Sequence, residues 1–555
     1  MDAYERLVEG LPTRLSPGRT QRLTEKATRD AVAAIPLANP VQAAQEVEGL
    51  LERMLATTWN GGERLAALEH LAGPVANLCA GIERHIGAEP YPLPPASAER
   101  AATAQRLEWQ LACAYAIGMH ELCAPAGKVP MFKGKLIAAA SVAALAHASE
   151  ALQWSYRQYR AAPAGVWRLL HAVHAFAAEC DVADQPADDP QVAGAVVSAR
   201  AAYLQALLLA ASNPYRFSTQ ELRNAVAAIR CVAGQCRLQA PTDAGVGIDA
   251  QADVGPHYVA GDAWQPGMLA LDVEPATRIF AERSAAWPET TDALELPAPG
   301  GGVQPASRRF LDHLKAGWIT AARGYGRIPA NHVLDVAVGM RALHYALAGG
   351  VDFATFVRRV QGEAMTAGRH GLKSAAPWPV TTDAAEPPAF RGEVLDQSEG
   401  GYRLRLQCGV VEGTRLRIGD VIGLATAADT VADRDWMVGV IRWLTHTDDG
   451  ELLGVELLHR TARAAGVRPI TVAGEPLVAQ RAIELPGAEG DVGLSLLIAN
   501  RFPHHVTTVE IVLPALVSDW KTAAEASLWK FAGAEEVGAG CVQVNLLPAA
   551  EAVRA

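Results

Sequence analysis

The chain of 555 residues is too long for one compact domain and suits two to four. Half of its residues are hydrophobic and a fifth are charged, which is the composition of a globular protein and excludes a largely disordered one. The net charge of −11 opposes binding to polymeric nucleic acid or to an anionic membrane, although a small dianion could still bind a local cluster of arginines.

The N-terminus and the cysteines indicate where the protein acts. The first residues, MDAYERLVEG, have neither a basic region nor an apolar core, so no signal peptide is expected. The most apolar helix-like run, 136–145, is far shorter than the ~20 residues that span a bilayer. Eight cysteines are scattered along the chain, mostly in apolar runs, and we expect buried free thiols. The sequence therefore predicts a soluble, cytoplasmic protein without membrane insertion.

The first half of the chain is predicted to be helical. Residues 1–35 are polar and are expected to form a loosely packed lead-in. Over 36–240, apolar residues recur at helical spacing and indicate about seven helices joined by short connectors. The last of these helices begins with a capping box, in which Ser218 and Glu221 cap each other's backbone. We expect an all-α domain with up-and-down packing over 36–240.

The second half of the chain has a different composition and residue pattern. Gly, Asp and Pro become frequent over 241–304, which is expected to be an irregular linker with a possible strand at 268–273. Over 305–475, alternating runs separated by Gly or Asp turns predict an antiparallel sheet or small barrel, with a partly helical stretch at 340–366. Two more strand-like runs predict a short β-rich extension over 476–555. The predicted fold class is α+β and multidomain.

Two short motifs in this second half carry the chemistry. The first places Arg323 and Arg327 four residues apart around Gly-Tyr-Gly, and the second contains Asp396, Ser398 and Gly401. Guanidinium groups bind phosphate through two parallel hydrogen bonds, keep their charge, and can also contact or stack on guanine. A carboxylate can accept from guanine N1–H and its amino group, and glycine lets backbone approach a ligand closely.

An R-x-x-x-R followed by a D-x-S-x-x-G in a β-rich setting resembles the PilZ domains, bacterial receptors for cyclic di-GMP. Three further segments resemble the family in the right order. They are Ile328-Pro329 running into a strand, a strand-turn-strand at 416–421, and a closing hairpin at 440–457. The resemblance covers about 305–475 and implies a PilZ-like antiparallel β-barrel there.

The same resemblance implies roles for the motif residues. Arg323 and Arg327 would contact phosphate and guanine, and Asp396 would bind the guanine edge. Ser398 would assist, and Gly401 would hold the turn.

The sequence departs from the family pattern at two places. About 70 residues separate Arg327 from Asp396, a gap much longer than is usual, so 340–385 is expected to be an insertion between the first two strands. Gln397 also replaces the apolar residue usual between Asp and Ser. A PilZ-like barrel that no longer binds nucleotide is therefore the alternative.

Other candidate sites are weaker. His171 and His174 lie three residues apart on a predicted helix, with Glu179 and Cys180 nearby, but no fourth zinc ligand has a supporting spacing, so packed or surface histidines are favoured. No G-x-x-x-x-G-K-[ST], G-x-S-x-G or H-E-x-x-H motif is present. We therefore expect no catalytic residue, no metal, no cofactor and no enzymatic activity.

The sequence thus predicts a cytoplasmic cyclic di-GMP effector. Ligand capture would order the segment from Arg323 to Arg327 and change how the helical domain docks, and that domain would bind a protein partner. The main alternative is a non-nucleotide-binding adaptor for a pilus, flagellar or secretion component. An enzyme with an unrecognised site in the helical domain is a third reading. The resemblance implies an output in motility, adhesion, exopolysaccharide production, biofilm formation or virulence, and the sequence does not choose among them.

Overall fold

The computed structural model describes most of the chain, namely residues 2–11, 24–87, 89, 91–285, 293–297, 303–319, 326–366, 378, 386–407, 415–426, 435–487, 493–503, 505–513, 528–538 and 541–549. The chain divides into two units. The first comprises Met1–Glu89 and Leu93–Ala322, and the second comprises Pro90–Pro92 and Arg323–Ala555.

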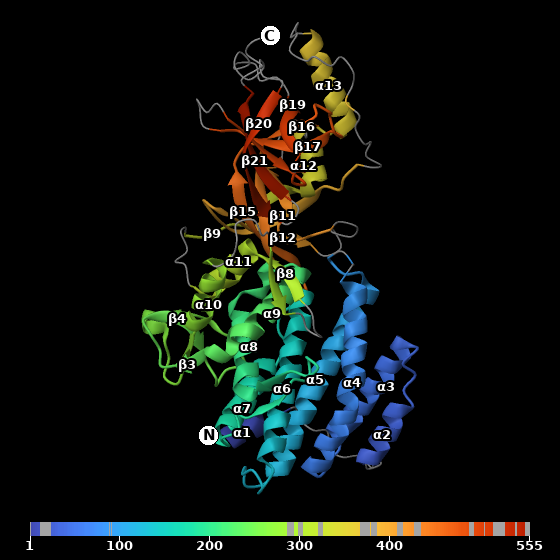
Figure 1. Cartoon of the computed structure of the whole chain (residues 1–555), viewed down its shortest axis with the longest axis vertical. Helices are drawn as coiled ribbons and strands as arrows, with labels where there is room; N and C mark the ends of the chain where they lie inside the picture. The colour runs from blue at the N-terminus through green and yellow to red at the C-terminus, as the bar shows by residue number, and fades with distance from the viewer. Residues whose placement is uncertain are drawn as a thin grey trace. The chain divides into compact units, whose positions relative to one another are not determined.

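Seven helices form the body of the first unit, as the helical spacing predicted. They are α3 (Pro40–Ala56), α4 (Gly61–Ile86), α5 (Pro95–Cys123), α6 (Gly134–Arg157), α7 (Val166–Glu179), α8 (Ala199–Ala211) and α9 (Thr219–Val232). Helix α5 packs between α4 and α6, and the three run up and down beside one another (Figure 1). The capping box at the start of α9 is present, with the Ser218 N–H donating to Glu221 Oε2 at 2.9 Å.

The N-terminal segment is better packed than its polar composition indicated. It contains α1 (Ala3–Glu9) and α2 (Glu25–Ala33). Leu7 of α1 is fully buried, and the backbone N–H of Ala3 donates to Glu179 Oε2 at 2.9 Å. The apolar positions of α1 are too few to stand out in sequence, so the expectation of a loose lead-in is corrected here.

The segment expected to be an irregular linker also carries regular structure. Its strands β4 (Ala244–Ile248), β5 (His257–Ala260) and β6 (Leu269–Asp272), with β3 (Arg237–Gln239), make an antiparallel sheet in the order β3-β6-β4-β5. Only β6 was anticipated. The other strands are short and contain Gly, His or charged residues, so they lack the alternation that identifies a strand. Four elements follow: α10 (Glu274–Ala285), β7 (Ala293–Pro297), β8 (Val303–Ser307) and α11 (Arg308–Trp318).

The second unit begins with the predicted antiparallel barrel. Its strands are β9 (Ile328–Pro329), β10 (Val333–Val338), β11 (Phe390–Ser398), β12 (Gly401–Gln407), β13 (Val421–Thr426), β14 (Trp436–Thr447) and β15 (Gly450–His459). The order is β10-β13-β14-β15-β12-β11-β9, and an additional β10–β11 pairing closes the ring. Helices α12 (Gly339–Leu347) and α13 (Phe353–Thr366) stand between β10 and β11 in the chain, where an insertion was expected.

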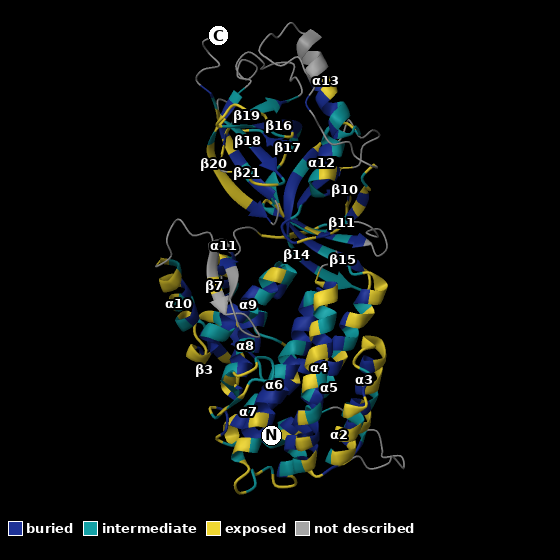
Figure 2. Cartoon of the chain, turned by 45° about the vertical axis from the view of Figure 1, so that its right-hand side comes forward, coloured by how far each residue is buried: buried dark blue, intermediate teal, exposed yellow. Residues whose placement is uncertain are grey.

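The extension predicted over 476–555 is part of a closed six-stranded barrel, which begins earlier, at Arg463. Its strands are β16 (Arg463–Thr471), β17 (Gln480–Leu485), β18 (Leu494–Ile498), β19 (Val506–Val512), β20 (Leu528–Gly538) and β21 (Cys541–Pro548). The side chains of Phe353, Phe356 and Val357 are buried in a cluster with Ala464 and Val512 of this second barrel. Figure 2 shows the buried interior of the barrel in dark blue.

Among the described helices, α4 and α6 are long and apolar enough to cross a membrane, judged by length and composition alone. Within the first unit, 72% of the apolar window of α6 and 39% of that of α4 are buried. The core helix of a bundle passes the same test, so these two helices are weak evidence for a membrane span.

Candidate functional site

The short strand β9 brings the two motifs together. It pairs antiparallel with β11, with Pro329 opposite Asp396 and Ile328 opposite Gln397. The N–H of Ala330 also donates to the carbonyl of Leu395 at 3.0 Å. This pairing closes the long gap between the motifs and leaves Arg327 at the end of β9, next to Asp396.

The carboxylate of Asp396 lies between two guanidinium groups. Arg327 donates from Nη1 to Asp396 Oδ1, and Nη1 of Arg403 lies 3.4 Å from Asp396 Oδ2. Arg327 and Arg403 keep 38% and 44% of their side-chain surface exposed, against 15% for Asp396. The three groups carry one net positive charge, and both cations face solvent, where an anion can reach them.

Gly401 is required by a close approach of two strands. A two-residue turn, Glu399-Gly400, connects β11 to β12, so that Ser398 lies opposite Gly401. A Cβ at Gly401 would collide with the carbonyl oxygen of Val455 on β15. The hydroxyl of Ser398 donates to the Gly401 carbonyl at 3.4 Å. Gly401 therefore lets β12 lie against β15, and the turn itself is made by its two neighbours.

One row of residues crosses four paired strands at this site. Asp396 lies opposite Arg403, Arg403 opposite Gly454, and Gly454 opposite Trp443. Directly opposed residues of antiparallel strands point to the same face of a sheet. The indole of Trp443 fills the space that a Cβ at Gly454 would need, so it lies on the face that carries Asp396 and Arg403. A half-buried aromatic ring thus stands on the same face as the charged pair.

The structure describes four of the five residues predicted to form the site. Arg327, Asp396, Ser398 and Gly401 lie together, whereas Arg323 falls outside the described residues. The sequence reasoning missed two further residues. Arg403 could have been found, because a two-residue turn after Ser398 fixes the hairpin register and sets position 403 opposite 396. Trp443 gave no signal, because its place depends on the pairing of β12, β15 and β14.

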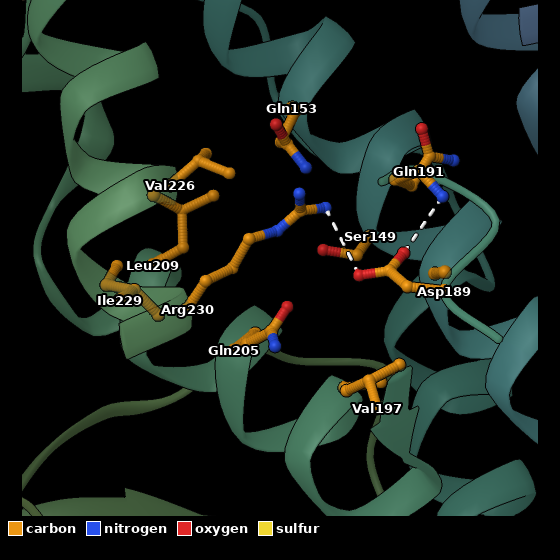
Figure 3. A pocket seen from close by; sticks show the side chains of 12 residues that line it. Ser149, Gln153, Asp189, Gln191, Val197, Gln205, Leu209, Val226, Ile229 and Arg230 are labelled. Carbon is orange, nitrogen blue, oxygen red and sulfur yellow. Dashed lines mark hydrogen bonds and ion pairs between the residues drawn. The ribbon is translucent and has the colours of Figure 1, made fainter. Parts of the chain in front are cut away.

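The helical unit contains a small cavity lined by both polar and apolar side chains (Figure 3). It measures about 20 Å³, and Arg230 and Asp189 face each other across it with Nη2 and Oδ2 3.9 Å apart. Ser149 and Gln153 of α6 add polar groups to the lining. A space of this size holds roughly one or two waters. It is too small for a cyclic dinucleotide or a comparable substrate.

The two histidines considered as zinc ligands are packed side chains. His171 Nδ1 lies 2.6 Å from the hydroxyl of Tyr203, and its Nε2 lies 3.0 Å from the Val254 carbonyl. The ring of His174 stacks on Tyr203, and burial lowers the pKa of His174 to about 4. Within the described part of the chain, no group of three or more His, Cys, Asp or Glu could hold a metal ion.

Two family models match the chain, and together they cover most of it. The model of the N-terminal domain of the cyclic-di-GMP receptor FimW matches residues 26–243. The model of the middle PilZ domain of the same receptor matches residues 247–387 and 373–464. The chain is a PilZ-domain protein. The range matched by the PilZ model begins at residue 247, so it includes the last part of the first unit as well as the first barrel.

A relative of this PilZ-domain protein matches over nearly the whole length. The cyclic-di-GMP receptor FimW of Pseudomonas aeruginosa is 22% identical over 527 residues, which cover 86% of this chain and 84% of the relative. No solved structure matches the chain. The family ranges end at residue 464, so most of the second barrel lies beyond them.

Proposed function

We propose that the chain is a non-enzymatic receptor for cyclic di-GMP, and that the ligand binds on the face of the PilZ barrel that carries Arg327, Asp396 and Arg403. The observation that carries the proposal is the carboxylate of Asp396 between two exposed guanidinium groups at the β9–β11–β12 edge. The match to a middle PilZ domain and the full-length relative named as a cyclic-di-GMP receptor support the same ligand.

The chemistry of the ligand fits this arrangement. Each phosphate can take a bidentate pair of hydrogen bonds from a guanidinium, and Asp396 can accept from the N1–H and amino group of guanine. The indole of Trp443 lies on the same face, where it can stack on a base. Arg323 is four residues from Arg327 and would supply a further cation.

The existing ion pair does not prevent ligand binding. Arg327 is 38% exposed, and exposed ion pairs of this kind contribute roughly 0–1 kcal/mol. A phosphate that takes Arg327 and a guanine that takes Asp396 would replace one weak pair by several charge-assisted hydrogen bonds. The exchange should therefore favour the bound state.

The proposed output follows from charge neutralisation. Arg323 and Arg327 repel each other, and a dianion bound between them would remove that repulsion and hold their segment against β11. We propose that this change alters the arrangement of the helical unit and the barrel, and with it the binding of a protein partner in the cytoplasm. In this account the protein acts as an effector.

Calorimetric titration of cyclic di-GMP into the full chain tests the proposal. Arg327→Ala should weaken binding roughly 10- to 100-fold, since it removes charge-assisted hydrogen bonds. Arg391→Ala is the matched control, because Arg391 lies on the same strand, β11, and is 77% exposed. Binding that is absent in the wild type, or equal in all three proteins, would reject the site.

A second function is favoured by one observation. Both carboxylate oxygens of Asp396 already have a guanidinium within 4 Å, so the site is satisfied without ligand. This agrees with an adaptor that uses the barrel as a scaffold and binds a pilus, flagellar or secretion component through the helical unit. An adaptor would show no heat in the titration, and its partner binding would not change when cyclic di-GMP is added.

A further inference from the structure

The loop between α5 and α6, residues 124–133, projects from one end of the helical unit (Figure 1). Its base is fixed by backbone hydrogen bonds from Ala124 to the His120 carbonyl and from Gly127 to the Cys123 carbonyl, both 2.9 Å. Gly127 has a φ of +64° and lies against the ring of Tyr4, leaving no room for a Cβ. The base therefore presents the rest of the loop from a defined position.

Two large apolar side chains form the tip of this loop. Lys133 N–H donates to the Pro130 carbonyl at 3.0 Å, which makes Met131 and Phe132 the two central residues of a turn. Met131 is 80% exposed and Phe132 is 94% exposed, more than any other large hydrophobic residue in the described part of the chain. The exposed loop is yellow in Figure 2.

The turn holds Phe132 in an unfavourable backbone conformation. Its φ is +63°, a value at which turns favour glycine and bulky residues are rare. A strained backbone and a fully exposed aromatic side chain therefore coincide at one residue. Strained positions of this kind concentrate at functional sites.

The segment that forms the tip carries only positive charges. Lys128, Lys133 and Lys135 are exposed, and they are three of only eight lysines in the chain. Residues 122–149 contain no Asp or Glu, although the chain holds 60 of them. The preceding carboxylate, Glu121, is already bound by Arg64 at 2.7 Å. The tip segment thus has three positive charges and no negative charge of its own, on a protein that is acidic as a whole.

We propose that this tip, defined as residues 128–135, docks on an anionic lipid surface. Met131 and Phe132 would enter the interfacial region, and the three lysines would lie at the level of the headgroup phosphates. A lipid surface fits because the two apolar side chains are exposed at the turn and three exposed lysines, whose stems are flexible, lie within four residues of them in the chain. The net charge of −11 disfavours the approach of the protein as a whole to an anionic membrane. Electrostatic interactions between exposed charges are screened over ~8 Å, so the charges close to the contact decide whether the tip binds.

The test is vesicle flotation with the full chain. The vesicles are either neutral phosphatidylcholine or contain about a third phosphatidylglycerol. The wild type should float with the anionic vesicles only. Phe132→Gly should weaken this binding roughly tenfold, and it relieves the backbone strain, so the fold should be kept. The triple change Lys128→Gln/Lys133→Gln/Lys135→Gln should weaken binding by roughly fivefold for each lysine.

Matched control variants distinguish binding through the tip from non-specific binding by other exposed apolar or basic side chains. Val196→Ser removes another exposed apolar side chain, 68% exposed, and Lys26→Gln removes an exposed lysine elsewhere. Both should bind anionic vesicles as the wild type does. No binding by the wild type, or equal binding by the tip variants, would overturn the proposal. Retention by soluble polyglutamate without vesicle binding would overturn it in favour of an acidic protein partner.

Discussion

The positions of Asp396 and Gly401 are explained by the groups that contact them. Asp396 is held by Arg327 and Arg403 at once, and these two ion pairs restrict its position. Glycine is required at position 401 because a Cβ there would meet the Val455 carbonyl and because the φ of +156° is one that other residues rarely adopt. The sequence identified both residues, but it assigned Gly401 to the turn, since a motif does not show which strand packs on the other side.

Gly401→Ala should destabilise the second unit by about 2 kcal/mol, because the added methyl forces β12 and β15 apart. Denaturant unfolding measures the change. Gly533→Ala on β20 is the control, because nothing lies within 4 Å of a Cβ at that position. An effect of equal size in both variants would show that the close approach at Gly401 is not the cause.

Asp420, at the start of β13, should make the stability of the protein depend on pH. Burial raises the pKa of its carboxyl to about 6, so the folded state binds the proton more tightly than the unfolded state does. The resulting stabilisation is full below about pH 4 and is lost as the pH rises through about 6.

Asp420→Asn should therefore be more stable than the wild type by about 1–3 kcal/mol at pH 7.5, and the difference should vanish near pH 4. Chemical unfolding at both pH values measures it, with the exposed Asp435→Asn as control for the loss of one carboxylate. A difference that stays the same at both pH values would contradict burial as the cause.

Strand pairing explains how much of the site the sequence could predict. The β11–β12 register follows from the two-residue turn and was within reach of the sequence, so Arg403 could have been placed. The pairing of β9 with β11 could not be predicted from the sequence, because a strand of two residues shows no alternation of apolar and polar residues. Trp443 reaches the site only through two further pairings, β12 with β15 and β15 with β14.

Trp443→Ala should weaken cyclic di-GMP binding roughly 5- to 100-fold if the indole stacks on guanine. Trp443→Phe keeps an aromatic face and should recover most of the affinity. Titration calorimetry compares the three proteins, and circular dichroism checks that each is folded. Equal affinities for the alanine and phenylalanine variants would show that stacking plays no part.

The described part of the chain contains more regular structure than the sequence predicted. The helical region was predicted well, because long helices repeat their apolar positions many times. The sequence predicted only two strand-like runs of the second barrel, since the pairings that close it, such as β16 with β19 and β18 with β21, are non-local. A cut at residue 475 would separate β16 from its partners β17 and β19, so functional work should use the full chain.

Hydrogen exchange on the full chain, with and without saturating cyclic di-GMP, tests the central claim most directly. The account predicts slower exchange at the amides of residues 326–330 and around Asp396 and Arg403, with β17 and β18 of the second barrel unchanged. Protection there should be lost in Arg327→Ala. Unchanged exchange at these amides in the presence of saturating ligand would contradict binding at this face of the PilZ barrel.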